Sequence, residues 1–145
     1  MAFPTETVYG LGGDGLNARS SEKIYQAKGR PSDNPLIIHI AQLEDLIRLQ
    51  RMFRTAQKNL AEKYWPGPLT MILRKKDIVP IETTGGLESV AVRMPSHKVA
   101  RALICYGGKY VAAPSANTSG RPKSNTCRAC NRGLEWQSRY DFRWR

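Results

Sequence analysis

Short apolar runs alternate with stretches of helical spacing along the chain, and this alternation constrains the fold more than any other feature. The segments compatible with β-strands are 2–9, 36–40, 69–73, 90–92 and 110–113. Helical patterns cover 21–28, 43–49, 55–64 and about 96–106. Strands that alternate with helices predict an α/β fold with an open sheet flanked by helices.

Polar and rigid residues mark the expected ends of these elements. Ser20 and Ser96 are expected to cap helices, because a hydroxyl can accept hydrogen bonds from the first free backbone N–H groups. Pro66-Gly-Pro68 should end the helix over 55–64, since proline lacks the N–H that a helix interior requires.

Gly10, Gly12 and Gly15 satisfy the pattern G-x-G-x-x-G between a predicted strand and a predicted helix. This pattern alone would suggest a dinucleotide-binding turn. However, the acidic residue expected on the ribose is misplaced, because Asp33 precedes the next strand instead of following it. We therefore do not predict a dinucleotide site.

The chain is strongly basic, with 23 Lys and Arg against 12 Asp and Glu and a formal charge of +11. Residues 126–145 carry five Arg against Glu135 and Asp141, or +3, which leaves +8 for residues 1–125. Such a balance indicates anionic partners such as nucleotides or RNA. The three cysteines cannot all pair, and there is no run of eighteen apolar residues, so we expect a cytoplasmic protein without a membrane partner.

Lys28 and Arg30 flank Gly29 and allow two interpretations. In an extended segment their side chains would project to the same side and suit a polyphosphate. Alternatively, they form the basic end of a helix capped by glycine. The spacing by itself favours the second interpretation.

Other polar residues are equally open by pattern alone. Ser115 and Asn117 follow a predicted strand, where they suit either ligand binding or an ordinary turn. His39 lies within an apolar strand, which is typical of a packed histidine. Cys127-x-x-Cys130 lacks a second ligand pair, so no protein-bound metal site is expected. No Ser-His-Asp or Cys-His set is evident, which leaves open a reaction driven by positioning and charge stabilisation.

Taken together, six segments resemble the YrdC-like threonylcarbamoyl-AMP synthase family, in family order and at family spacing. They are FPTETVYGLG at 3–12, IY at 24–25 leading to KGRP at 28–31, NPLI at 34–37 with His39, WPGPLT at 65–70, VAVRMP at 90–95, and APSAN at 113–117 with SG at 119–120. The resemblance implies a YrdC-like twisted open mixed sheet flanked by helices.

The resemblance also implies roles for individual residues. Lys28, Arg30, Ser115 and Asn117 match the family's K-x-R and S-x-N signature and would bind the phosphates and the reacting carboxylate as catalytic residues. The substrate-binding residues for threonine, ATP and bicarbonate would be Thr5, Tyr9, His39, Arg93 and Ser119.

The implied reaction joins L-threonine, bicarbonate and ATP into threonylcarbamoyl-AMP and pyrophosphate. The resemblance implies that ATP is a substrate accompanied by Mg²⁺, and that the protein itself has no metal site. Downstream threonylcarbamoyl-transfer proteins would then modify tRNA. Two alternatives remain. One is an RNA-binding module that contacts double-stranded RNA or tRNA through a basic surface, and the other is a carbamoyl-transfer domain of hydrogenase-maturation type.

The chain departs from the family pattern at both ends. We expect residues 1–124 to form an incomplete YrdC-like domain, because Met1 falls where relatives are already inside a strand. Residues 125–145 have neither helical nor strand periodicity. One possible codon series for these residues, when it is read one base later, translates into a sequence that resembles the family's continuation after the S-x-N segment. We therefore expect a frameshift near Asn125, an aberrant tail outside the native fold, and low activity of the 145-residue chain.

Overall fold

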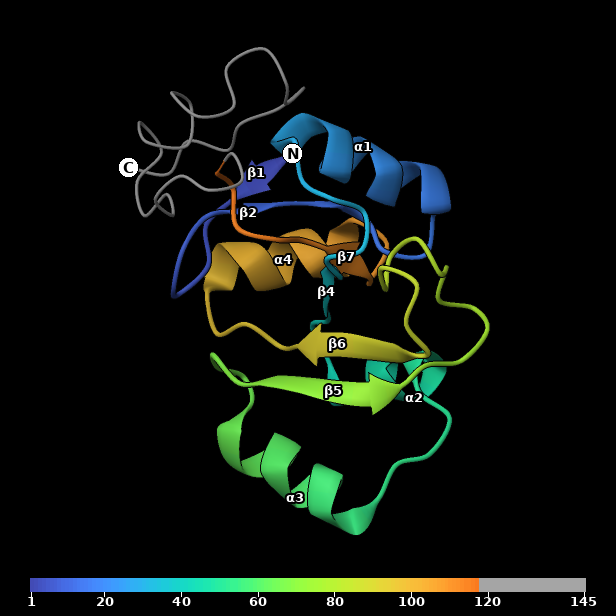
Figure 1. Cartoon of the computed structure of the whole chain (residues 1–145). Coiled ribbons are helices and arrows are strands. Elements are labelled where there is room, and N and C mark those ends of the chain that lie inside the picture. The colour runs from blue at the N-terminus through green and yellow to red at the C-terminus, as the bar shows by residue number, and fades with distance from the viewer. Residues whose placement is uncertain (118–145) are drawn as a thin grey trace.

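The computed structural model describes residues 1–117, which form a five-stranded sheet, a separate pair of short strands and four α-helices (Figure 1). The strands are β1 (Ala2–Phe3), β2 (Gly10–Leu11), β3 (Gly13–Asp14), β4 (Ile37–His39), β5 (Thr70–Arg74), β6 (Ser89–Arg93) and β7 (Val111–Ala112). The helices are α1 (Ala18–Lys28), α2 (Leu46–Leu49), α3 (Thr55–Tyr64) and α4 (Lys98–Tyr106), with a 3₁₀ turn at Leu43–Asp45.

The larger sheet has the strand order β3-β7-β4-β6-β5. The β4–β6 pair is parallel, whereas the β3–β7, β4–β7 and β5–β6 pairs are antiparallel. Strands β1 and β2 pair antiparallel with each other. The predicted α/β class with a mixed sheet flanked by helices is therefore confirmed.

Strand β7 shows how the sheet is covered on both faces. Successive strand residues point to opposite faces. Val111 packs in one apolar cluster with Ala100 and Ile104 of α4, whereas Ala112 packs in another with Ile24 of α1. Helices α1 and α4 thus lie on opposite faces of β7, which places the residues after β7 between two layers.

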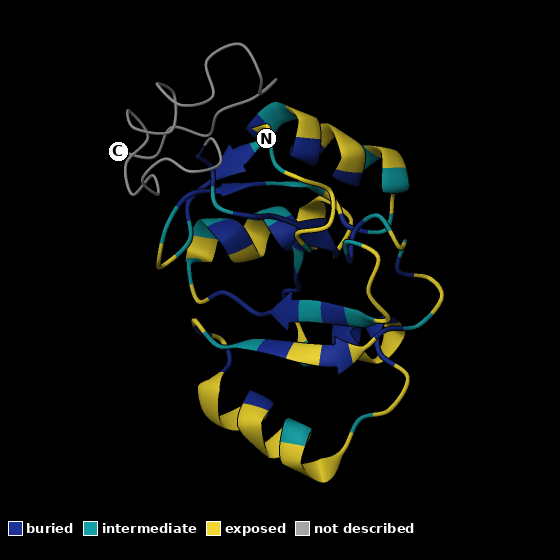
Figure 2. Ribbon diagram, in the orientation of Figure 1, coloured by how far each residue is buried: buried dark blue, intermediate teal, exposed yellow. Residues whose placement is uncertain are grey.

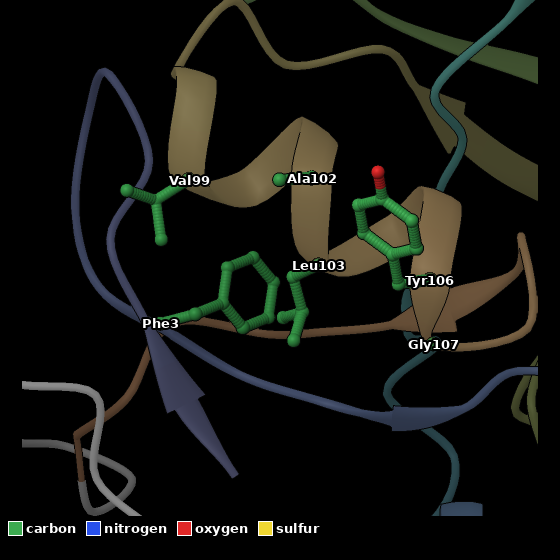
Figure 3. A pocket seen from close by; sticks show the side chains of 6 residues that line it. All are labelled: Phe3, Val99, Ala102, Leu103, Tyr106 and Gly107. Atoms are coloured by element: carbon green, nitrogen blue, oxygen red, sulfur yellow. The ribbon is translucent and has the colours of Figure 1, made fainter.

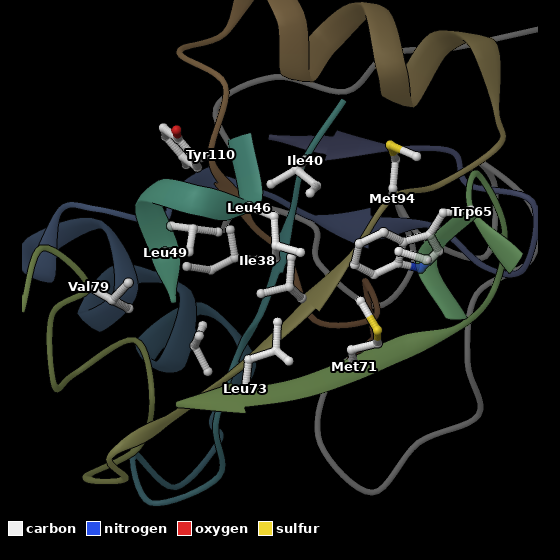
Figure 4. Packing of buried hydrophobic residues seen from close by; sticks show 13 residues of the cluster. Ile38, Ile40, Leu46, Leu49, Trp65, Met71, Leu73, Val79, Met94 and Tyr110 are labelled. Carbon is white, nitrogen blue, oxygen red and sulfur yellow. The ribbon is translucent and has the colours of Figure 1, made fainter. Parts of the chain in front are cut away.

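The largest apolar cluster joins the central strands to α2 and α3 (Figure 4). Its buried members are Ile38, Ile40, Leu46, Leu49, Ala61, Trp65, Met71, Leu73, Val79, Val90, Val92, Met94 and Tyr110. Fully burying an aliphatic or aromatic side chain of this kind stabilises a fold by about 1.5–3 kcal/mol. This cluster provides a rigid base for the ends of β4 and β6.

Helix α3 differs from the other elements, because most of its surface is exposed (Figure 2). Ala61 is its buried residue, and Leu60 and Tyr64 remain 45% and 47% exposed. Its bounds, Thr55–Tyr64, are those predicted from the apolar spacing and the following Pro66.

Both predicted helix caps are wrong by one to three residues. Helix α1 is capped by Asn17, whose side chain accepts a hydrogen bond from the Ser20 backbone N–H at 3.4 Å. Helix α4 is capped by His97, whose Nδ1 accepts from the Val99 N–H at 3.2 Å. Asparagine and histidine both offer an acceptor at the position where Ser20 and Ser96 were expected to supply one.

The first predicted strand is also shorter than expected, because only Ala2–Phe3 is extended and paired. Gly12 follows in a tightly packed place, where an added Cβ would lie 2.6 Å from Phe3 Cε1 and 2.9 Å from Val111 Cγ1. A Cβ at Gly15 would lie 3.2 Å from the Ala112 backbone nitrogen. These glycines permit close packing of β1–β3 against β7.

No helix within residues 1–117 is both long and apolar enough to cross a membrane.

Candidate functional site

Segments far apart in the sequence meet around a pocket of about 430 Å³. They are the loop between β1 and β2 (residues 4–9), the chain between α1 and β4, the ends of β4 and β6, and the segment after β7. The lining residues are Thr5, Thr7, Val8, Tyr9, Gly10, Arg30, Pro35, Ile37, His39, Arg93, Ala113, Pro114 and Ser115.

Backbone hydrogen bonds hold two of these segments together. The Leu11 N–H donates to the Pro114 carbonyl at 2.9 Å, and the Ala116 N–H donates to the Tyr9 carbonyl at 2.7 Å. Between them, Gly10 and Ser115 form an antiparallel bridge. The chain after β7 is therefore fixed against β2, and Ser115 is brought to the pocket wall.

Thr5 sets the local shape of the 4–9 loop. Its hydroxyl accepts hydrogen bonds from the backbone N–H groups of Thr7 and Val8 at 3.3 and 3.2 Å, and donates to the Val8 carbonyl at 2.6 Å. Such hydroxyl-to-backbone turns are a common use of threonine. The loop consequently presents Thr5, Thr7 and Tyr9 to the pocket.

Arg93 connects this loop to the sheet. Its Nη2 donates to Glu6 Oε1 at 2.6 Å and to Thr7 Oγ1 at 3.2 Å, and its Nε donates to the Gly67 carbonyl at 3.3 Å. Burial alone would raise the pKa of Glu6, but the hydrogen bond and charge of Arg93, with backbone hydrogen bonds, hold that pKa below its usual value. The Glu6–Arg93 pair is thus ionised at neutral pH.

His39 lies beside Arg93, its register partner in the parallel β4–β6 pair. Its Nδ1 is 3.2 Å from the Ile37 carbonyl oxygen, and the Phe3 ring packs against it edge-on at 6.2 Å between centroids. Burial, together with the Arg93 charge, lowers the pKa of His39 to about 4. His39 is therefore neutral at physiological pH, in agreement with the packed histidine predicted from its apolar strand.

Arg30 enters the pocket from the end of α1. Gly29 caps this helix in the left-handed conformation with φ 56°, and the Arg30 N–H donates to the Tyr25 carbonyl at 3.0 Å. Beyond the cap, Arg30 Nη2 donates to Asn34 Oδ1 and to the Pro35 carbonyl, the latter at 3.1 Å. Burial lowers the pKa of Arg30, and the nearby Tyr25 opposes that effect.

Lys28 takes a different direction from Arg30. It is 2% exposed, and its Nζ donates to the backbone carbonyls of Ser115 and Asn117. The segment is a capped helix end, so the alternative in which both side chains project together from an extended chain is wrong. Lys28 instead ties the last turn of α1 to the backbone of the S-x-N segment.

Six of the nine residues proposed from the sequence line the pocket. These are Thr5, Tyr9, Arg30, His39, Arg93 and Ser115. Lys28 and Asn117 lie behind the lining and meet each other through the hydrogen bond to the Asn117 carbonyl. Ser119 falls outside the described residues, as do the proposed tail at 125–145 and the Cys127–Cys130 pair.

Sequence reasoning missed the two residues that hold the pocket's guanidinium groups. Glu6 pairs with Arg93, and Asn34 accepts from Arg30. Both belong to segments singled out for the resemblance, FPTETVYGLG and NPLI. The partner of Glu6 could not be assigned, because 87 residues separate it from Arg93 and no local pattern joins them.

A second pocket, of about 360 Å³, lies between β1 and α4 (Figure 3). Its lining residues are Phe3, Val99, Ala102, Leu103, Tyr106 and Gly107, and none of them carries a charge. That pocket offers no charged or strongly polar group for catalysis, so the pocket with Arg30 and Arg93, which holds most of the predicted residues, is the candidate site. Within residues 1–117 no group of three or more His, Cys, Asp or Glu could hold a metal ion.

Comparison with known proteins places this arrangement in a family. Residues 1–141 match the Sua5/YciO/YrdC family model, whose description is "Telomere recombination". Two curated threonylcarbamoyl-AMP synthases, from Pyrococcus abyssi and Bacillus subtilis, are 53% and 54% identical over 122 and 123 residues. Each alignment covers 84% of this chain but only 36% of the relative, so the chain spans about a third of these proteins.

A solved structure, P. abyssi Sua5 complexed with L-threonine, agrees with the fold at a TM-score of 0.92 and 48% identity. The superposition covers 94% of this chain and 40% of that one. The extent of the family match, together with the pocket formed by the predicted segments, shows that this chain belongs to the Sua5/YciO/YrdC family.

Proposed function

We propose that this chain supplies the substrate pocket of a threonylcarbamoyl-AMP synthase, which forms threonylcarbamoyl-AMP and pyrophosphate from L-threonine, bicarbonate and ATP. The observation that carries the proposal is the meeting of Thr5, Arg93, Arg30 and Ser115 in one pocket. It is supported by a relative of 48% identity that was solved with L-threonine.

The chemistry requires no protein nucleophile. The threonine amine, as the free base, attacks the carbon of bicarbonate, and loss of one water molecule leaves an N-carboxylate. An oxygen of this carbamate then attacks the α-phosphorus of ATP, and pyrophosphate leaves. The protein has to gather mutually repelling anions and align them, which is catalysis by positioning and fixed charge.

We assign the phosphates of ATP to the Arg30 side of the pocket. Arg30 Nη2 is held by the neutral oxygens of Asn34 and Pro35, and no carboxylate among residues 1–117 pairs with this guanidinium, so its positive charge remains to attract an anion in the pocket. Ser115 adds a hydroxyl to the same pocket. Lys28 supports this side from behind through the Ser115 and Asn117 carbonyls.

We assign L-threonine to the side formed by the 4–9 loop, His39 and Arg93. The hydroxyls of Thr5 and Thr7 and the neutral His39 ring offer short polar contacts beside the paired Arg93. Mg²⁺ would be bound mainly through the ATP phosphates and water, because this ion is commonly held by substrate phosphates with few protein ligands. It would neutralise phosphate charge there.

We further propose that the product serves tRNA modification in the cytoplasm, where ATP and tRNA are available, through downstream transfer proteins. Direct RNA contact would use basic residues such as Arg48, Arg51 and Lys76, which surround a shallow hollow of about 500 Å³. Arg51 already pairs with Asp77 at 2.6 Å, so this surface is only partly free for phosphates. The synthase reading is therefore the better supported one.

Binding of L-threonine to the 145-residue chain tests the proposal without requiring full activity. We expect isothermal titration calorimetry to detect L-threonine and ATP, with clearly weaker binding of L-valine, which lacks the hydroxyl. A polar site rejects an analogue that leaves its hydrogen-bonding groups unpaired. If L-threonine and L-valine bind equally, or neither binds, the assignment of the pocket is wrong.

A further inference from the structure

The Glu6–Arg93 ion pair joins the 4–9 loop to the sheet. Glu6 Oε1 is 2.6 Å from Arg93 Nη2, and the two side chains are only 20% and 11% exposed. The same guanidinium reaches Thr7 and the Gly67 carbonyl. Arg93 therefore fixes two otherwise separate segments at one point, with Glu6 as its charged partner.

Glu6 itself does not line the pocket, but its neighbours Thr5 and Thr7 do. The Thr5 turn determines the local shape of the loop, whereas the Glu6–Arg93 contact holds the middle of the loop against β6. Without Glu6, Thr7 Oγ1 at 3.2 Å would remain as the loop's contact with the Arg93 guanidinium. The pair thus controls the distance between the loop and the strand ends.

Glu6 also offsets the positive charge of Arg93 and restricts the orientation of its guanidinium. A carboxylate and a guanidinium in direct contact form charge-assisted hydrogen bonds with restricted geometry. With one side of the guanidinium held by Glu6 and another by Gly67, Arg93 can present only its remaining face to a ligand. This arrangement suits a zwitterionic amino acid better than a polyanion.

We propose that Glu6 is a positioning residue for the amino-acid substrate, acting through Arg93 and the 4–9 loop. This inference rests on the proposed function, because it assumes that threonine occupies this side of the pocket. It goes beyond that function by assigning selectivity between the two substrates to an ion pair that lies outside the lining.

The test compares Glu6→Gln, Glu6→Asp and the wild-type 145-residue chain. Calorimetric titrations with L-threonine and, separately, with ATP give two dissociation constants for each protein. We expect Glu6→Gln to weaken threonine binding about tenfold and ATP binding less than about twofold, because the substitution removes the negative charge that holds Arg93 on the threonine side and leaves at most a neutral hydrogen bond. Glu6→Asp retains the charge and should recover part of the loss.

Glu44→Gln is the matched control. Glu44 is exposed in the 3₁₀ turn before α2 and forms no ion pair among the described residues, so its substitution should change neither constant. Thermal unfolding of each variant shows whether the fold is retained at the titration temperature.

The outcomes distinguish failure of the positioning role of Glu6 from failure of the proposed function. Unchanged threonine binding in Glu6→Gln would overturn the positioning role, and so would equal weakening of threonine and ATP, which indicates general structural damage. If Glu6→Gln does not fold but Glu6→Asp does, the test rests on Glu6→Asp. Selective weakening of threonine binding in Glu6→Asp then supports the positioning role, and unchanged threonine binding overturns it. If the wild-type chain binds ATP but not threonine, the proposed function itself fails.

Discussion

The two guanidinium groups of the pocket are compensated in different ways. Arg93 is held by the carboxylate of Glu6, whereas Arg30 is held by the neutral oxygens of Asn34 and Pro35. The Arg93 side therefore has little net charge, and the Arg30 side retains its positive charge. The difference teaches that one pocket can offer a cationic region to phosphates and a nearly neutral, hydrogen-bonding region to an amino acid.

The supporting structure also differs between the two sides. Arg93 extends from β6, which belongs to the largest apolar cluster and pairs with strands on both sides. Arg30 follows a helix cap and is held by a loop in which Asn34 is exposed. We expect substitutions on the Arg93 side to alter folding as well as binding, and those on the Arg30 side to alter mainly ligand affinity.

Replacing Arg30 should have the largest effect on ligand binding. We expect Arg30→Met to weaken ATP binding by about 100-fold, because a charge-assisted contact to phosphate is lost from a partly buried site. Threonine binding should change by less than about threefold. Calorimetric titration of both substrates measures these constants.

Arg19→Met provides the control for Arg30→Met, because Arg19 is exposed on α1 and does not line the pocket. It removes the same charge from the same part of the chain. Equal losses of ATP affinity in both variants would mean that overall charge, and not the Arg30 contact, governs binding. The proposed difference between the two sides would then have to be abandoned.

Acid should disturb the Arg93 side, where His39 is held neutral. The pKa of His39 is about 4 in the folded protein, against about 6.5 in an unfolded chain. Between these values the unfolded state binds more protons, so the stability present above about pH 6.5 is lost as the pH falls toward 4. The expected loss in the free energy of unfolding is on the order of 2–3 kcal/mol.

Urea unfolding at a series of pH values measures this loss, and His39→Met should reduce its size. The only other histidine, His97, caps α4 through its Nδ1 acceptor, and His97→Gln should lower stability by about 1 kcal/mol at neutral pH without removing the acid-dependent part that His39 causes. Glu6, whose pKa is lowered, adds a further loss only at more acidic pH. An unchanged pH dependence in His39→Met would show that other groups cause it.

Much of this fold could be predicted from the sequence, because its elements follow local patterns. The apolar spacing of α3 and the residues that stop it identify its bounds, and β-branched residues identify β4. The caps were misplaced because several adjacent residues can supply an acceptor. Asn17 lies before the expected cap Ser20, and His97 lies just after the expected cap Ser96. Which residue becomes the cap depends on where the chain turns in the folded protein.

The site was predicted less completely, for a different reason. A resemblance can identify Arg30 or Arg93, but it does not say which oxygen holds each guanidinium. The direction of Lys28 illustrates the same limit. Whether its ammonium meets a ligand or the Ser115 carbonyl depends on the left-handed cap at Gly29 and on a segment 87 residues away.

The smallest expected effect comes from making the two sides of the pocket alike. Asn34→Asp would give Arg30 a carboxylate partner, as Arg93 already has in Glu6. We expect ATP binding to weaken by about three- to fivefold, because an exposed ion pair contributes up to about 1 kcal/mol and offsets part of the charge that phosphate requires. Titrations at low and high salt should show a smaller difference at high salt, since screening weakens exposed pairs.

Asn59→Asp is the control, because it adds the same charge to exposed α3, far along the chain from Arg30, and should leave ATP affinity within about twofold. If Asn34→Asp binds ATP as tightly as the wild type at low salt, ATP affinity does not depend on whether the partner of Arg30 is neutral or charged. The two sides of the pocket would then differ in geometry and not in charge.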